Sequence, residues 1–548
     1  MTSSLFGIYN AHRSLLMNQA ALNLVNSNIT NMNTEGYSKQ RLEISQNVLG
    51  GSAPGTPLNA AQSGLGAYVD NISRNRDAFL DSYYRKETTT LGYYSELQNN
   101  NVMLEDITNE LSNTGINSTL NDFYNAANQL NSNPTDTVAR TDFAQKAENV
   151  ALKLNHLYEQ LNSFNQSAAG NPADPATLGQ SQIGVTVTEL NTKLQNLADL
   201  NNTIIVSTSQ DITPNGLLDQ RDLLLDQISQ YIPITVKPGA GNVVNVSLGG
   251  NELVSGRVFT TRLEYELTDT AQQGNNTTNP AIIKLKNNTT NNTLIPNANA
   301  MLNSGKIGAL LDLTETNSTS PNNVNGILGQ LNNLARTFAK EVNDIQLSKD
   351  GNDNTLSLSM DKTTSPPTLT EATDYIFTSS DPTVADEVTT SDNYDNITAG
   401  NIKLNSNILS DPYKIAASKL TYDPTDTKYA DKADFIAKNN TQTGDGSNIM
   451  LISQLRNKGI TSLNGSTTEN YVNTMLGKFG IQSGTVSDKL NAQTAVVDQI
   501  KQKRETAIGV NLDEELTDMV KYQRSYEASS KVFNVVNQVI QEMIKLGS

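Results

Sequence analysis

Residues 21–37 form an asparagine-rich segment, Ala21-Leu-Asn-Leu-Val-Asn-Ser-Asn-Ile-Thr-Asn-Met-Asn-Thr-Glu-Gly-Tyr37. Two series that recur every seven residues run into it: Ile8, Leu15, Leu22 and Ile29, and, three residues later in each case, Ala11, Asn18, Val25 and Met32. Paired series at this spacing are typical of the contact face of a coiled coil. We therefore predict one helix over residues 4–33, ending where Gly36 suits a left-handed stop.

The other end of the chain carries the same pattern. Its two series are Met519, Tyr526, Phe533 and Ile540, and Tyr522, Ser529, Val536 and Met543. An isolated amphipathic helix is marginal in water, so each stripe needs a partner, either the other terminus or other copies of the chain. We expect both ends to be disordered in the monomer and to order on assembly. This pattern favours a structural building block over a catalyst.

The residues of these stripes define an expected assembly interface. Its members are Ile8, Leu15, Leu22, Val25, Ile29, Met519, Tyr522, Tyr526, Phe533, Val536 and Ile540. Tyr522 and Tyr526 could instead form a ligand-binding aromatic pair, but a spacing of four residues on a heptad helix favours packing. Side chains that could fix the register between neighbouring helices by hydrogen bonding are Asn23, Asn26, Asn28, Asn31 and Asn33.

Composition excludes several classes of function. The chain has 548 residues, too many for one hydrophobic core and enough for three or four domains. Only 36% of the residues are hydrophobic and 5% aromatic, which indicates elongated helices and small domains with much exposed surface. The formal net charge is −17 and no stretch is dense in Lys or Arg, so binding to nucleic acid or to an anionic membrane is disfavoured.

The chain contains no cysteine, which excludes disulfides, thiolate metal sites and cysteine nucleophiles. It has two histidines, His12 and His156, so a multi-histidine metal site or a histidine-based triad is disfavoured. The N-terminus lacks the basic and apolar regions of a signal peptide, and no apolar run approaches the length of a membrane span. Two alternatives remain: a cytoplasmic protein, or one exported without a cleaved signal, which the absence of cysteine favours slightly.

Periodicity along the chain predicts a mainly α fold with a β insert. Long helices are expected over 73–112 and through the apolar residues of 143–164 and 183–204, and short strands with a Gly249-Gly250 hairpin from 234 to 267. The predicted domains are a coiled-coil core of 1–50 and 505–548, a helical rod of 51–233 and 441–504, a β-rich or mixed outer domain of 234–349, and a variable β-rich outer insert of 350–440. Asn511 is expected to cap the last helix, with Glu514 as its reciprocal partner.

No motif in the chain carries recognisable chemistry. His-Glu-x-x-His, Gly-x-Ser-x-Gly, Walker-type and Rossmann sequences are absent. The stretch Asp350–Asn354 resembles a calcium loop only superficially, because it lacks the alternating acids and the terminal glutamate, and a turn fits it better. His12 is expected at a polar, subunit-facing or solvated position. We therefore expect no enzyme activity, no catalytic or metal site and no cofactor.

The segment quoted at the outset resembles the signature shared by bacterial flagellar rod, hook and hook-associated proteins. The residues that carry this signature are Asn31, Asn33, Thr34, Gly36, Tyr37 and Gln40. Further stretches resemble the hook-associated protein 1 family: 36–40, 64–66, 72–74 with Asp77, 79–80, 84–85, 218–222, 249–256, 305–310, 512–516 and 522–529. Lys39 replaces the arginine of that family pattern. The resemblance spans both ends and much of 64–345 but barely covers 350–400.

The resemblance implies a subunit exported unfolded through the flagellar type III channel and assembled, outside the cell, at the junction between hook and filament. It implies that the terminal helices pair and line the inner core, that the helical rod forms the wall, and that the β insert faces outward. The implied partners are other copies of the chain in a ring or helical lattice, the hook protein below, a second hook-associated protein and the filament above, and an export chaperone at the C-terminal helix. Nucleic acid and membrane insertion are not implied.

Two alternatives are weighed against the junction role. A filament subunit is disfavoured because Asn-Thr-x-Gly-Tyr is not a flagellin feature, and a hook subunit because of Lys39-Gln40 and the long helical rod. A secreted coiled-coil effector or adhesin that works alone would have folded termini in the monomer. That alternative gives no reason for the signature at residues 21–40.

Overall fold

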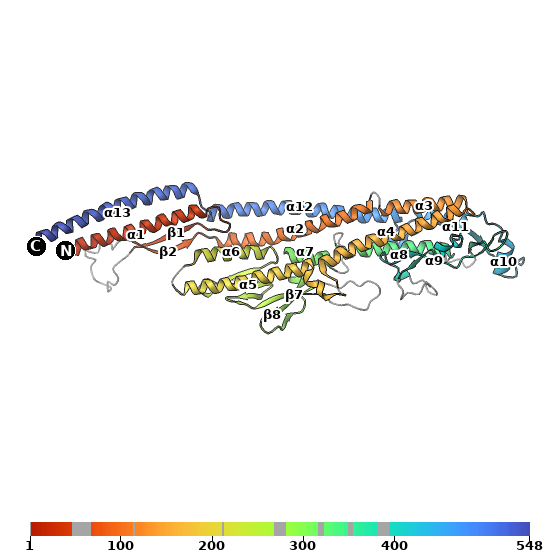
Figure 1. Ribbon diagram of the computed structural model, residues 1–548, viewed down its shortest axis with the longest axis horizontal. Helices are drawn as coiled ribbons and strands as arrows, with labels where there is room; N and C mark the ends of the chain where they lie inside the picture. The colour runs from red at the N-terminus through yellow and green to blue at the C-terminus, as the bar shows by residue number, and fades with distance from the viewer. Residues whose placement is uncertain are drawn as a thin grey trace.

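The two terminal helices, α1 (Thr2–Asn31) and α13 (Leu512–Gly547), lie side by side in the computed structural model and run in opposite directions (Figure 1). They contact each other more extensively than any other two elements. The structure describes residues 2–46, 67–112, 115–171, 173–210, 213–267, 281–315, 323–348, 355–380 and 394–547. Gly36, at a φ of 81°, turns the chain after α1 as predicted from the sequence.

A two-stranded antiparallel sheet connects α1 to the rest of the molecule. Its strands are β1 (Gln40–Gln46) and β2 (Ala67–Arg74), and both contact α1. The long helix predicted from residue 73 begins instead at Ala78, because residues 67–74 pair with β1 and the Asp77 side chain accepts hydrogen bonds from the amides of Phe79 and Leu80. Residues 50–66, whose Gly, Pro and Ser content predicts an extended segment or a loop, lie outside the described residues.

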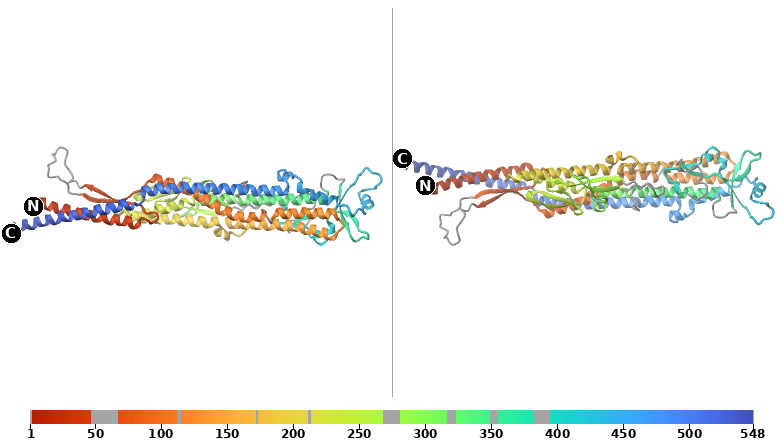
Figure 2. Two further views of the ribbon diagram at one scale, coloured as in Figure 1. Left: turned by 90° about the horizontal axis from the view of Figure 1, so that it is seen from above. Right: turned by 90° about the horizontal axis from the view of Figure 1, so that it is seen from below.

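The rod consists of long helices that run along one axis (Figures 1 and 2). They are α2 (Ala78–Ser112), α3 (Ile116–Ser132), α4 (Thr137–Ala169), α5 (Gln182–Thr208), α6 (Asn215–Ser229), α7 (Gly305–Thr314), α8 (Val324–Gln346), α11 (Ser447–Gln454) and α12 (Thr468–Ile508). α12 packs against α2 along most of its length, which joins the two halves of the chain as expected. Gly509 ends α12.

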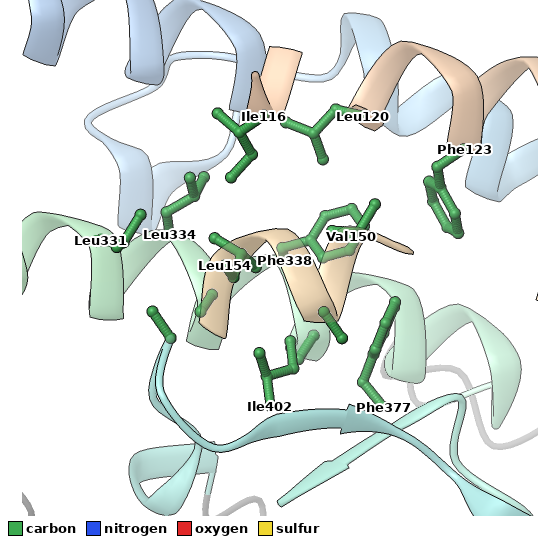
Figure 3. Packing of buried hydrophobic residues seen from close by; sticks show 14 of the residues in the cluster. Ile116, Leu120, Phe123, Val150, Leu154, Leu331, Leu334, Phe338, Phe377 and Ile402 are labelled. Atoms are coloured by element: carbon green, nitrogen blue, oxygen red, sulfur yellow. The ribbon is translucent and has the colours of Figure 1, made fainter. Parts of the chain in front are cut away.

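The distal end of the rod contains a closed hydrophobic core (Figure 3). Phe123 of α3 and Phe338 of α8 lie at its centre, with ring centroids 5.3 Å apart. The chain deviates here from the expected domain boundaries, because α8 and the strands β12 (Phe377–Ser379) and β13 (Ile402–Leu404) pack into this core instead of an outer domain or insert. Short strands with buried Phe377 and Ile402 could not be recognised within a polar stretch.

The β insert forms two small sheets against α5 and α6. One contains β3 (Thr235–Pro238), β4 (Val244–Leu248), β5 (Asn251–Ser255) and β6 (Val258–Phe259), and the other β7 (Thr261–Leu267), β8 (Ala281–Asn287) and β9 (Thr293–Ile295). The hairpin predicted at Gly249-Gly250 is present, and both glycines have positive φ, 54° and 89°.

The remaining elements lie at the distal tip. They are β10 (Thr355–Asp361), β11 (Thr368–Glu371), β14 (Ser418–Thr421), α9 (Ser406–Ser410) and α10 (Lys432–Asn439), with β10 in the centre of a three-stranded sheet. Leu356, Leu358, Leu369 and Phe435 form a small separate core beneath this sheet. The calcium-like stretch 350–354 lies outside the described residues.

Candidate assembly site

The paired terminal helices only partly cover the expected interface. Of the eleven residues predicted from the heptads, Val25 is buried, Tyr526 is exposed by 39%, and the others are half-buried. The stripe residues therefore keep part of their apolar area in contact with solvent although α1 and α13 pack together. That these side chains form a coiled-coil contact in an assembly stays a prediction.

A second apolar surface on the same pair was not predicted. On α13 it consists of the exposed residues Leu512, Leu516, Val520, Val532, Val535 and Val539, and on α1 of Tyr9 and Leu16. Within α13 they form two groups, Leu512, Leu516 and Val520 at steps of four, and Val532, Val535 and Val539 at steps of three and four, so each group lies on one helix face beside the heptad stripe. These residues lie outside the heptad positions, so a seven-residue period does not indicate them.

A buried amide links the two termini where α1 ends and α13 begins. The side chain of Asn28 donates hydrogen bonds to the Gln40 carbonyl at 3.0 Å and to the Glu515 carboxylate at 3.1 Å. Its oxygen accepts from the Tyr37 hydroxyl at 2.8 Å and from the Gln40 amide at 3.1 Å. Asn28 and Glu515 are 1% and 2% exposed. We call this set, Asn28, Tyr37, Gln40 and Glu515, the Asn28 latch.

Lys39 adds an ionic contact at the edge of the latch. Its ammonium group lies 2.9 Å from Glu514 and 3.1 Å from Glu515, in the first turn of α13, where acidic side chains also complement the helix dipole. Burial disfavours the charge of Lys39, but the two carboxylates raise its pKa overall, and Lys39 in turn lowers the pKa of Glu514. Asn511 caps α13 as predicted, accepting from the Asp513 amide at 2.9 Å. Glu514, predicted to reach back to Asn511, pairs with Lys39.

The signature residues serve two local purposes. Asn31 bonds the Ser27 carbonyl, Thr34 bonds the Asn31 side chain, and Gly36 supplies the positive φ, so these three shape the turn. Tyr37 and Gln40 belong to the latch. Asn33 is exposed. Among the predicted asparagines, Asn28 is the one whose described bonds reach α13, so the expected ladder along the helix is a single contact at its end.

A buried cluster of ionised side chains fixes this region to the rod. We call it the arginine–aspartate cluster: Arg74, Arg76, Asp81, Arg85, Asp219, Arg221, Asp222, Asp226 and Arg504. No side chain in it is more than 12% exposed. Asp222 is the hub, within 3.0–3.5 Å of four arginines. Sequence analysis had matched 72–74, 84–85 and 218–222 to a family pattern without bringing them together.

The cluster joins segments that are far apart in the chain. Ser38 donates to Asp219 at 2.7 Å, and Arg504 of α12 pairs with Asp81 of α2 at 2.8 Å and with Asp226 of α6 at 2.6 Å. Burial alone would raise the pKa of Asp222, but the guanidinium groups around it, Arg76 foremost, hold its pKa below the usual value. A buried charge is tolerated only when it is paired, so these contacts depend on one another.

Other predicted features lie apart from this site. His12 and His156 are both exposed, on α1 and α4. Within the described residues, no group of three or more His, Cys, Asp or Glu side chains is placed to hold a metal ion. None of the helices in the described ranges is both long enough and apolar enough to cross a membrane.

Comparison with known proteins gives concordant matches at both sequence and fold level. The family described as flagellar hook-associated protein FlgK helical domain matches residues 102–355, and the family described as flagellar basal body rod FlgEFG protein C-terminal matches 501–546. The chain is 26% identical to flagellar hook-associated protein 1 of Bacillus subtilis, covering 99% of this chain and 98% of that protein. It is 25% identical to the Salmonella typhimurium protein of the same name, covering 96% and 97%.

The fold is similar to a solved structure, that of the flagellar hook junction protein FlgK from Burkholderia pseudomallei. The TM-score is 0.55 at 18% sequence identity, and the match covers 77% of this chain and 99% of that one. At this identity the likeness concerns the fold alone. It supports the mainly α architecture with a β-rich insert.

Proposed function

This chain belongs to the flagellar hook-associated protein 1 family, and from that premise we propose how its structure serves the junction between hook and filament. As a member of the family it is a structural component of the bacterial flagellum that assembles with other axial components. We propose that copies of the chain associate through the paired terminal helices. The rod would form the wall of the assembly, and the β insert would face outward.

One observation carries this proposal: the terminal pair is an incomplete packing unit. Its heptad residues are half-buried, and apolar residues such as Val532 and Val535, 53% and 58% exposed, lie beside them. Exposed apolar surface of this kind marks an interaction site. The Asn28 latch and the arginine–aspartate cluster hold this incomplete unit at one end of a rod with its own core. Such an arrangement suits a subunit that completes its core with neighbours.

We propose that the neighbours are those of the family: other copies of the chain, the hook protein below, and a second hook-associated protein and the filament above. Export in an unfolded state without a cleaved signal, with a chaperone at the C-terminal helix, belongs to the same proposal. The absence of cysteine, which leaves nothing to cross-link during passage, supports it. The proposed role is structural and requires no catalytic group.

Limited proteolysis with mass spectrometry tests the proposal, on the purified chain alone and after incubation with isolated hooks. We expect cleavage within residues 1–50 and 510–548 in the free protein and protection of both ends on hooks, with the distal core of α3, α4 and α8 resistant in both states. Ends that resist the protease in the free chain and are unaffected by hooks would contradict the proposal. They would favour an effector or adhesin that works alone.

A further inference from the structure

A groove of about 610 Å³ lies between α2 and α5, far from the terminal helices. Val102 and Met103 of α2 and Val185 of α5 line it, and they are 50%, 50% and 43% exposed. Glu96 and Glu189 lie in the same lining. The rest of the lining is neutral and polar, from residues such as Asn99 and Gln182, so the groove combines an apolar patch with two carboxylates and is open to solvent in a single copy of the chain.

The acidic groups of the groove have no close cationic partner among the described ion pairs. Glu189 accepts a hydrogen bond from the Tyr231 hydroxyl at 3.0 Å, and burial followed by this contact raises the pKa of Tyr231 to about 12. Lys193 and Lys306 lie over the Tyr231 ring, 5.8 and 5.2 Å from its centroid. No described salt bridge within 4 Å joins either lysine to Glu96 or Glu189. The groove keeps negative charge that a cation from outside could meet.

The exposed face of α12 carries the complementary chemistry. Ile481 is 74% exposed there, and its neighbour Lys478 is exposed too. Around Ile481, a Cβ built at Gly477, Gly480 or Gly484 would meet open space. Glycine weakens a helix interior, so three of them on one exposed face have no local benefit. They leave Ile481 as a single apolar projection on a smooth surface that a second helix can approach closely.

The projection and the groove lie at the same height of the rod. Val486 of α12 packs with Leu97 of α2. Because the two helices run in opposite directions, Ile481 and Val102 each lie five residues further toward the distal end, about 7.5 Å along the axis. Val486 packs on α2, whereas Ile481, about 140° further round α12, is exposed to solvent. Figure 1 shows α12 on one side of α2, with α6 and α7 and, beyond them, α5 on the other side.

We propose that Ile481 and Lys478 of one copy dock into the groove between α2 and α5 of the next copy. This inference rests on the proposed function, in which copies assemble beside one another, and it names the rod surface that they share. Two different patches on opposite flanks at one height form a head-to-tail contact, which repeats around a ring or a helical path. Ile481 would pack on Val185 and Met103, and Lys478 would meet the carboxylates.

Cysteine cross-linking tests the contact, because the natural chain has no cysteine. The full-length double variant Ile481→Cys with Val185→Cys is assembled on isolated hooks and treated with a short bifunctional maleimide. We expect the double variant to give covalent dimers and a ladder of larger species. Each single variant has one cysteine per chain and can give no species larger than a dimer. The matched control combines Val185→Cys with Val138→Cys. Val138 is 73% exposed, about as much as Ile481, but lies at the distal start of α4. That pair should give no ladder.

Charge exchange provides a second measurement that a folding defect cannot imitate. Lys478→Glu should lower incorporation onto hooks about tenfold, because it places like charges together at every contact. Adding Glu189→Lys to the same chain should restore most of that loss. The proposal is overturned if the double-cysteine protein incorporates as well as the natural chain but yields no ladder. If the natural chain itself does not incorporate onto hooks, the proposed function is wrong, and the proposed contact between copies is wrong as well.

Discussion

The distal core and the terminal pair both consist of long helices but differ in how completely they bury their apolar side chains. In the distal core, Phe123 and Phe338 are 0% and 1% exposed and each touches aromatic rings from other elements. In the terminal pair, Leu22 and Phe533 remain half-buried against a single partner helix. α8 is covered by α4, α11 and the β12 strand, whereas α13 is covered by α1 alone over most of its length. The distal core is thus closed within one copy of the chain, whereas the terminal pair leaves apolar surface exposed, as the proposed assembly requires.

We expect the largest effect from a charge placed in the terminal helices, which should prevent assembly without changing the folding of the monomer. Leu22→Asp or Phe533→Asp would place a charge in the terminal contact, which cannot be buried without a partner. We expect incorporation onto hooks to be abolished while the main thermal transition of the monomer stays unchanged. Hook-binding assays and calorimetry measure the two quantities. Leu152→Asp, at an exposed position of α4, is the control that should incorporate normally; normal incorporation of either terminal variant would show that these residues do not contact neighbours.

The converse change in the distal core should affect folding first. Phe338→Ala removes a fully buried ring, which typically destabilises a core by about 3–5 kcal/mol. Urea unfolding followed by circular dichroism should show a lower midpoint. Phe79→Ala, at a ring 75% exposed, should change the free energy of unfolding by no more than about 0.5 kcal/mol. Equal effects of the two substitutions would mean that the distal core is not the stable part of the chain.

Asp222→Asn should loosen the joint between these two regions. Four arginines around residue 222 would lose their shared counter-charge, a loss of about 3 kcal/mol at neutral pH. Because the pKa of Asp222 is held low in the folded chain, its contribution is complete above the pKa of the unfolded carboxyl and disappears as pH falls through the lower folded value. Hydrogen exchange in β2 and α6 should thus differ between variant and parent at pH 7 and converge in acid. Exposed Asp498→Asn should have no effect.

The smallest effect is expected at the Asn28 latch. Asn28→Ala removes four hydrogen bonds and leaves the buried Glu515 without its amide donor, a local loss of about 1–3 kcal/mol. Amide exchange around residues 36–40 and 512–516 should accelerate, with no change in the distal core. Asn33→Ala, at an exposed position in the same turn, should exchange like the parent. Faster exchange throughout the chain would show that the latch supports more than the termini.

Helices were predictable wherever their own periodicity was long. Apolar residues of α4, α5 and α8 recur at steps of three and four, and the turn at Gly36 and the hairpin at Gly249-Gly250 follow from local backbone needs. The start of α2 was predicted too early, because the pairing of β2 with β1 sets where the helix can begin. That pairing cannot be predicted from residues 67–77 alone. Likewise, Phe377 and Ile402 lie in strands of three residues, too short to show a period.

The sequence indicated many residues of the site but not which of them contact one another. The heptads at the two ends of the chain lie on helices that pack together, α1 and α13, but the contact of the two stripes and their role in an assembly are still predictions. The arginine–aspartate cluster was invisible as a unit because its members come from 74 to 504, and no local pattern indicates which arginine meets which aspartate. Of the five asparagines, Asn28 bonds to α13 within the described contacts, and the register contacts expected of the others stay a prediction, since a polar helix face does not reveal which amide is buried.

The span of the arginine–aspartate cluster also has a consequence for the order of folding. One of its contacts joins residue 81 to residue 504, so the cluster cannot be completed in any fragment that lacks Arg504. Contacts of such long sequence separation form slowly, after local helices and the distal core. We therefore expect the joint to be the last part of the chain to become rigid during refolding, and a chain truncated before Arg504 to stall with a folded distal half and an open base.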